Sequence, residues 1–503
     1  MSAARLAPLA SLLMALAAPA PVAARAAAPA ACPPRPLARC FTLTVPLDRG
    51  GTVPGSVRLR AAWIASRRAF RPPLIGLTGG PGQAGVVFAE TYDIILPTVG
   101  RDLVVFDQRG TGGSGLLRCA AFERRVLTGL SDPAGACGRS LGPRRSFYTS
   151  ADSADDLEAL RIRLGAPRIA LYAVSYGTRV ALEYARRHPQ RVERMILDSP
   201  IGIDAPDPLA RETFAAVPRV VRDVCRAGCG GAGAHPVSDL ARLRARLRRA
   251  PIRHILRRGA RRVPVRVDAD DLLSMLVSGD LEPELLAEIP PAVRAALTGH
   301  GGALARLKLR LLSIDSGGSI SEFSPALFAT TTCEESPLAW DPAAGPARRR
   351  SQARAAADAT PAAAFYPFDR RAALAAGPLP LCADWPAPAR AVTPEPPLPA
   401  GIPALVLSGE LDLRTPLETA RALTRALPGA QLLVERGVGH SVLGADPGGC
   451  ADAAVGAFLD GGALPRCRRD AAALTLAGRS AVLRRARPRS PAGRRGVRGR
   501  LSR

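Results

Sequence analysis

Apolar runs alternate with amphipathic segments in the first part of the chain. Four of these runs are predicted to be buried strands, at 74–78, 103–106, 169–174 and 192–197. Between them, the segment 151–164 places Leu157, Leu160 and Leu164 on one face of a helix, and a second helical run covers 178–188. Strands that alternate with helices in this way are typical of a parallel α/β sheet.

Two earlier runs, at 41–46 and 57–65, have a different pattern. The second alternates apolar residues with arginines, which is typical of a strand with one side facing solvent. We expect both runs to form an antiparallel beginning to the same sheet.

The pattern changes between residues 203 and 400. This stretch is predicted to be mostly helical, with an arginine-rich part at 240–262 and proline-rich connections. The earlier pattern then resumes, with strands at 404–408 and 430–434 and helices at 416–427 and 451–459. A helical insertion in a parallel sheet suggests a cap, because active sites lie at the carboxyl ends of such strands. The predicted organisation is a core at 29–202 and 401–470 with a helical cap at 203–400.

The beginning of the chain, residues 1–28, is predicted to be a secretory signal peptide. Arg5 supplies a positive charge, and the apolar segment at 6–18, too short for a membrane span, leads into small residues. We therefore expect the protein in the medium, the periplasm or the cell envelope of a bacterium. Acylation at Cys32 is a less favoured alternative, because Pro29 stands where an aliphatic residue is expected.

Ten cysteines follow the signal segment. They form neighbouring pairs along the sequence: Cys32 with Cys40, Cys119 with Cys137, Cys225 with Cys229, Cys333 with Cys382, and Cys450 with Cys467. In an oxidising compartment, five disulfides are the simplest interpretation, although the sequence does not fix their connectivity.

The charge balance changes this picture little. The 503 residues carry a formal net charge of +26, almost all of it from arginine, since Lys308 is the single lysine. Such a bias is typical of a GC-rich bacterial genome, and no nucleic-acid-binding module accompanies it, so no nucleic-acid partner is expected. The basic tail at 471–503 is predicted to be disordered, and weak contact with an anionic envelope is its alternative role.

The strand at 169–174 runs directly into a helix, with Ser175 between them. Gly177 follows two residues later, and this spacing predicts a nucleophile elbow, a turn so tight that only small neighbours fit. The usual motif is G-x-S-x-G, and Ala173 replaces its first glycine. An ordinary strand–turn–helix with a chance serine remains the alternative at this point.

A serine nucleophile needs a base and an orienting acid. Of the five histidines, His440 follows the last core strand in a glycine-containing loop. Asp412 follows the strand at 404–408, and Glu410 is its competitor for the acid role. The chain order Ser175, Asp412, His440 belongs to the α/β-hydrolase fold, with a mostly parallel sheet.

Two glycine-rich loops follow predicted strands. Gly79-Gly-Pro-Gly82 brings the Gly80 N–H near the sheet edge, where it and the Tyr176 N–H are candidates for an oxyanion hole. In the second loop, at 107–115, Asp107 and Arg109 are expected to brace the chain.

Five motifs together resemble one known family. They are Gly79-Gly-Pro-Gly82, Asp107-Gln-Arg-Gly-Thr-Gly, Val174-Ser-Tyr-Gly-Thr178, Gly409-Glu-Leu-Asp412 with Thr415-Pro416, and Gly439-His440. In this order they resemble the secreted tripeptidyl aminopeptidase branch of the prolyl-aminopeptidase-like α/β hydrolases, including their TAP-like C-terminal region. The resemblance implies an exported serine exopeptidase that releases one to three residues from peptide N-termini. Thr78, where single-residue prolyl aminopeptidases usually have histidine, favours the tripeptidyl branch.

An aminopeptidase must also hold the free ammonium of its substrate. Glu334 and Glu335, next to Cys333, are the candidate pair, with a solvated acidic turn as the alternative. No metal or organic cofactor is expected, and peptides with a free N-terminus are the expected partners. The sequence carries no prediction of oligomeric state. An esterase or lactone hydrolase with the same triad is the first alternative function, and a non-catalytic envelope-binding protein is the second.

Overall fold

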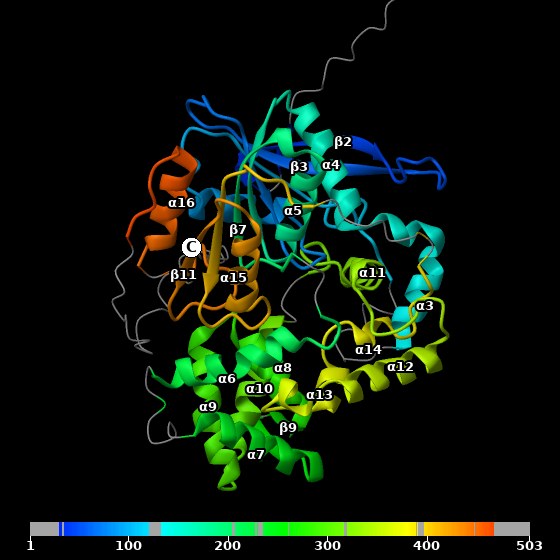
Figure 1. Ribbon diagram of the computed structural model, residues 1–503, viewed down its shortest axis with the longest axis vertical. Helices are drawn as coiled ribbons and strands as arrows, with labels where there is room; N and C mark the ends of the chain where they lie inside the picture. The colour runs from blue at the N-terminus through cyan, green and yellow to red at the C-terminus, as the bar shows by residue number, and fades with distance from the viewer. Residues whose placement is uncertain are drawn as a thin grey trace, which may run out of the picture.

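The computed structural model describes residues 30–32, 35–119, 132–203, 207–226, 229, 235–259, 261–315, 319–388, 390, 397–446 and 448–466. Within these residues, nine strands form one sheet (Figure 1). In spatial order they are β1 (Ala30–Cys32), β2 (Arg35–Pro46), β3 (Ser56–Ile64), β5 (Leu103–Phe106), β4 (Leu74–Leu77), β6 (Ile169–Val174), β7 (Val192–Asp198), β10 (Ala404–Gly409) and β11 (Gln431–Glu435). The predicted signal peptide at 1–28 and basic tail at 471–503 lie outside the described residues.

The sheet is antiparallel at one edge and parallel elsewhere. Strands β1, β2, β3 and β5 pair antiparallel in turn, whereas the pairings from β5 to β11 are parallel. Every residue of β4, β5, β6 and β10 is buried, as expected for parallel strands covered on both faces. In β3, Val57 and Leu59 are buried while the intervening Arg58 is exposed, which confirms the alternation predicted from the sequence.

Helices cover both faces of this sheet. On one face, α4 (Ser150–Arg163), α5 (Tyr176–Arg187) and α15 (Leu417–Ala426) pack their apolar residues in one cluster. On the other face, α1 (Ala89–Ile95) and α16 (Cys450–Asp460) form a second cluster. Helix α4 begins one residue earlier than predicted, because Thr149 and Asp152 form a capping box.

The chain leaves the sheet after β7 and returns at β10. The intervening helices are α6 (Arg211–Arg226), α7 (Pro236–Arg249), α8 (Ala269–Gly279), α9 (Pro283–Leu297), α10 (Gly302–Asp315), α11 (Pro325–Glu335), α12 (Pro346–Ala359), α13 (Arg370–Ala375) and α14 (Leu379–Cys382). Figure 1 shows α6 to α10 gathered at one end of the molecule, opposite β2 and β3.

One part of this insertion is not helical. The arginine-rich stretch predicted at 240–262 divides into α7 and an antiparallel hairpin, β8 (Ile252–Arg258) and β9 (Arg261–Val267). The physical reason is a change of period: Val265 and Val267 are buried while Arg266 between them is exposed, which is strand alternation. The many arginines concealed that change in the sequence.

Four of the predicted cysteine pairs form disulfides: Cys32–Cys40, Cys119–Cys137, Cys225–Cys229 and Cys333–Cys382. Cys450 is also disulfide-bonded, while its predicted partner Cys467 lies outside the described residues. The Cys333–Cys382 bridge joins α11 to α14 inside the insertion. None of the helices that the structure describes is both long and apolar enough to cross a membrane.

Candidate active site

Ser175 stands between the end of β6 and the start of α5. Its φ of 54° and ψ of −123° form a conformation that side-chain-bearing residues rarely adopt, as expected for a nucleophile elbow. Gly177 makes the turn possible, because a Cβ there would lie 2.6 Å from the Leu77 carbonyl oxygen. Ala173 is fully buried in β6, so the structure accommodates the methyl group at the position where the usual motif has glycine.

The loop after β4 lies against this elbow. A Cβ on Gly79 would lie 3.0 Å from the Ser175 Cβ, so only glycine lets the loop come this close. Gly80 follows with φ of 109°. Two glutamines that sequence analysis did not select support the loop. Gln83 accepts a hydrogen bond from the Gly79 N–H at 3.2 Å, and Gln108 donates to the Thr78 carbonyl at 2.9 Å.

Tyr176 is the first residue of α5. The N–H groups of a helix's first turn have no acceptor within the helix, and they carry the positive end of its dipole. The Tyr176 N–H, directly after the candidate nucleophile, therefore has no acceptor within the helix. Together with the approach of the Gly79–Gly80 backbone to Ser175, this arrangement can stabilise an oxyanion.

Asp412 and His440 are in direct contact at the carboxyl ends of β10 and β11. The His440 Nδ1 and the Asp412 Oδ2 are 2.9 Å apart, and the Asp412 side chain is completely buried. The backbone N–H groups of Arg414 and Thr415 each donate to Asp412 Oδ1 at 2.9 Å. Thr415 Oγ1 also donates to Asp412 Oδ2 at 2.8 Å. The competitor Glu410 instead accepts from the Gly437 N–H at 3.4 Å, so the geometry favours Asp412 as the orienting acid.

This pair is electrostatically suited to proton transfer. Burial alone would lower the pKa of His440, but the Asp412 carboxylate outweighs burial and raises the pKa above its ordinary 6.5. Burial would likewise raise the pKa of Asp412, but His440 and the donors of Thr415 hold that pKa below its ordinary value. The result is an ionised carboxylate beside an imidazole whose pKa lies above its ordinary value.

Asp198 and Ser199, at the end of β7, connect the serine with the histidine loop. The Ser175 N–H donates to the Asp198 carbonyl at 2.9 Å. The Asp198 carboxylate accepts from the N–H groups of Val442 and Leu443, and Ser199 Oγ accepts from the Ser441 N–H. These contacts hold the segment after His440 beside the strand that neighbours the elbow strand. A buried acid at a strand end was the sequence signal for Asp198, and sequence analysis missed it.

The second glycine-rich loop has a structural role, as predicted. Asp107 accepts from the N–H groups of Val86 and Gly113, at 2.8 and 2.7 Å. Arg109 forms two hydrogen bonds with Asp156, at 2.7 and 2.6 Å, in a buried ion pair. The polar groups of both side chains bind other parts of the protein, and these contacts brace the loop.

The predicted acidic pair divides into two different environments. Glu334 is buried, pairs with Arg145 at 2.8 Å, and accepts from Ser146 and Trp385 at 2.7 and 2.8 Å. These internal contacts occupy its carboxylate.

Glu335 lies next to the elbow helix. Its carboxylate pairs with Arg179 of α5 at 3.1 Å and lies 3.5 Å from the Tyr176 hydroxyl. It also accepts from the N–H and hydroxyl of Ser150. Burial raises the pKa of Glu335, against the lowering effect of Arg179. Of the predicted pair, Glu335 is therefore the member that contacts α5, the helix that begins directly after Ser175.

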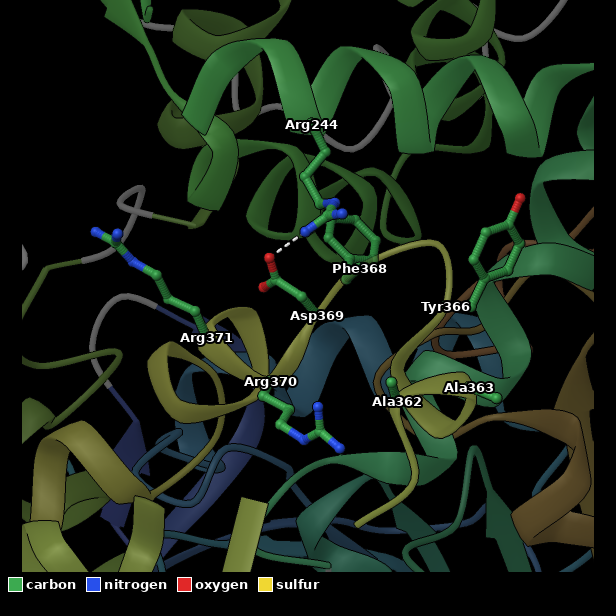
Figure 2. Close-up of a pocket in the computed structure, with 8 residues that line it drawn as sticks. All are labelled: Arg244, Ala362, Ala363, Tyr366, Phe368, Asp369, Arg370 and Arg371. Atoms are coloured by element: carbon green, nitrogen blue, oxygen red, sulfur yellow. Dashed lines mark hydrogen bonds and ion pairs between the residues drawn. The ribbon is translucent and has the colours of Figure 1, made fainter. Parts of the chain in front are cut away.

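A separate pocket of about 560 Å³ lies within the insertion. Its lining comes from α7, the turn at 362–368 and α13, and includes none of Ser175, Asp412 and His440. Figure 2 shows Arg244 and Asp369 pointing toward one another there, while Arg370 and Arg371 point away from this pair. Among the described residues, no three His, Cys, Asp or Glu side chains are grouped so as to hold a metal ion.

Two parts of this chain match known protein families. Residues 72–224 match the α/β hydrolase fold family, and residues 366–472 match the TAP-like protein family. The tripeptidyl aminopeptidase of Streptomyces coelicolor is 27% identical over 195 residues, covering 34% of this chain and 36% of that protein. Serine protease Hip1 of Mycobacterium tuberculosis is 31% identical over 157 residues, covering 27% and 30% of the two chains. The matched segments thus span about a third of these relatives.

A solved structure, the proline iminopeptidase of Mycobacterium smegmatis, aligns with 84% of this chain and 98% of its own, at 16% identity and a TM-score of 0.40. The two family matches lie on either side of most of the helical insertion, in the order expected for an interrupted sheet. The chain has the α/β hydrolase fold, and its C-terminal part is similar to the TAP-like proteins.

Proposed function

We propose that this hydrolase is an exported serine peptidase that releases one to three residues from free peptide N-termini. The observation that carries the proposal is the hydrogen bond between Asp412 and His440, in a loop that Asp198 connects with a serine in the backbone conformation of a nucleophile elbow. Relatives with peptidase names make a peptide the favoured substrate. The disulfides support export, because such bonds persist in oxidising compartments.

In the proposed reaction, Ser175 Oγ attacks the carbonyl carbon of the scissile bond. His440 Nε2 accepts the serine proton, while Asp412 holds Nδ1–H and stabilises the imidazolium. The N–H groups of Gly80 and Tyr176 stabilise the oxyanion of the tetrahedral intermediate. The imidazolium then protonates the leaving amine, and the C–N bond breaks to leave an acyl-enzyme. Water, deprotonated by His440, releases the N-terminal product and restores Ser175.

The ammonium group of the substrate is proposed to bind Glu335. The long 3.5 Å contact with the Tyr176 hydroxyl is the one that an ammonium can replace, because the other Glu335 contacts are shorter. Glu335 thus contacts the side chain of Tyr176, and the backbone N–H of the same residue belongs to the proposed oxyanion hole. We further propose that residues 203–400 act as a cap that limits access to this place.

A substrate panel tests this function. Aminoacyl and tripeptidyl arylamides, simple aryl esters and longer peptides are compared, each with a free and an N-acetylated amine, and the products are sized by mass. An aminopeptidase loses activity when the amine is blocked and releases fragments of constant length. Equal activity on blocked substrates with a preference for esters would favour the esterase alternative. Failure of folded protein to react with a fluorophosphonate at Ser175 would favour the non-catalytic alternative.

A further inference from the structure

Asp280 belongs to the insertion, but its contacts are with the loops of the core that carry the acid and the base. It follows α8 directly, as the residue that ends the helix. Its carboxylate accepts from the N–H groups of Leu413 and Arg414, at 3.1 and 3.0 Å, and from Arg414 Nε at 2.9 Å. Its main-chain carbonyl accepts from the His440 N–H at 2.9 Å. One residue therefore holds the segment after Asp412 and the backbone of His440 together.

The packing around Asp280 is tight. Its side chain is completely buried, and its charge is compensated by Arg414 and the two backbone donors. Gly439 must lack a side chain, because a Cβ there would collide with the Asp280 carbonyl oxygen. The glycine that precedes the catalytic histidine is thus explained by the approach of the insertion.

We infer that Asp280 is a positioning residue, through which the insertion fixes the placement of His440 relative to Asp412. This inference rests on the proposed function, since it concerns the same triad. It assigns to the insertion a part in the geometry of proton transfer, besides any part in covering the substrate.

The charge of Asp280 also acts on His440. The groups facing Asp280 are Arg414, Asp412 and His440. Burial, together with the nearby Asp412 carboxylate, raises the pKa of Asp280 to about 6, although Arg414 opposes this. Above that pH the Asp280 carboxylate is charged, and it adds to the rise in the pKa of His440 that Asp412 causes. Loss of this charge must lower the pKa of His440.

The first test is Asp280→Asn, which keeps the shape of the side chain and removes its charge. We expect kcat to fall by roughly 10- to 100-fold, the usual cost of a lost supporting contact, with KM changed little. In wild type, kcat/KM decreases below the His440 pKa, which lies above 6.5, because the protonated imidazole cannot accept the serine proton. In the variant this acidic limb should move to lower pH, because the Asp280 charge that raises the pKa of His440 is lost.

Asp271→Asn is the matched control on the same helix. Asp271 pairs with Lys308 at 2.7 Å and caps α8, away from the triad loops. This variant can lose stability but should keep the wild-type pH profile. If Asp280→Asn also keeps kcat and the position of the limb, the positioning role is wrong. Ser175→Ala is measured in parallel. If the Ser175→Ala protein is active, the proposed function is wrong. If Ser175→Ala is inactive and Asp280→Asn has wild-type kinetics, only the positioning role of Asp280 is wrong.

A second variant covers the case in which Asp280→Asn does not fold. Arg414→Gln leaves Asp280 in place and removes the side chain that anchors its carboxylate. We expect a smaller fall in kcat in the same direction, with KM unchanged, and slower fluorophosphonate labelling of Ser175. Wild-type kcat and labelling in a folded Arg414→Gln protein would contradict the inference.

Discussion

The carboxylates Asp412 and Asp369 each lie beside a positively charged or chargeable side chain, but they differ in what that partner can do. At the sheet edge, Asp412 contacts His440, and Ser175 lies on the adjoining elbow. In the pocket of the insertion, Asp369 contacts Arg244 (Figure 2). Asp369 also pairs with Arg248 at 3.3 Å. An arginine stays protonated throughout the accessible pH range, whereas a histidine changes charge near neutral pH.

The difference shows that a concave, charged place is not by itself a catalytic site. The pocket has an open volume of about 560 Å³, but the ion pair of Arg244 with Asp369 links α7 to the start of α13. The sheet edge has the proposed nucleophile in a strained conformation, a histidine proposed as its base, and an aspartate proposed as the orienting acid. Whether a carboxylate can support catalysis therefore depends on the side chain it contacts. Substitutions at the sheet edge and in the pocket should have very different effects on activity.

The largest expected effect is at the nucleophile. Ser175→Ala should lower turnover on the order of 10⁶-fold, because the other triad members cannot act without the serine oxygen. The variant should fold normally, since the half-buried hydroxyl is not needed for the turn and Gly177 is unchanged. Hydrolysis rates and thermal unfolding of the purified protein measure both expectations. Activity close to wild type would show that the sheet edge is not the catalytic place.

A smaller effect is expected at the proposed ammonium site. Glu335→Gln should lower kcat/KM for free-amine peptides by roughly 10- to 100-fold, since hydrogen bonds to charged groups are worth about 1.5–3 kcal/mol. Hydrolysis of an aryl ester without an amine should change much less. The ratio of the two activities is the decisive measurement, because loss of the Arg179 ion pair alone would affect both substrates equally.

Glu334→Gln is the matched control for Glu335→Gln. Its carboxylate is buried with Arg145, so breaking the pair should cost about 3–5 kcal/mol of stability. The ratio of free-amine to ester activity should stay as in wild type for the protein that remains folded. A changed ratio in Glu334→Gln and an unchanged one in Glu335→Gln would reverse the assignment.

Local patterns in the sequence predicted the core well. The strands before Ser175 and Asp412 are recognisable as mostly apolar runs, and four cysteine pairs follow from their closeness in the sequence. The contacts that join distant segments could not be predicted in this way. Asp280 lies 133 and 134 residues from Leu413 and Arg414, which it holds, and in the sequence it looks like an ordinary acid at a helix end. Likewise, Glu334 and Glu335 are neighbours in sequence, but in the folded protein they bind different partners.

The smallest effect is expected in the pocket of the insertion. Asp369→Asn keeps a side chain that can accept from the Ala372 N–H and cap α13, but it removes the charge that faces Arg244. Since a partly exposed ion pair is worth at most about 1 kcal/mol, stability should fall slightly and kcat/KM should stay within about twofold. Asp369→Ala, which also loses the cap, should be less stable by about a further 1 kcal/mol with the same activity. A tenfold loss of kcat/KM in a folded Asp369→Asn protein would show that the pocket takes part in substrate binding, and the distinction between the two places would then fail.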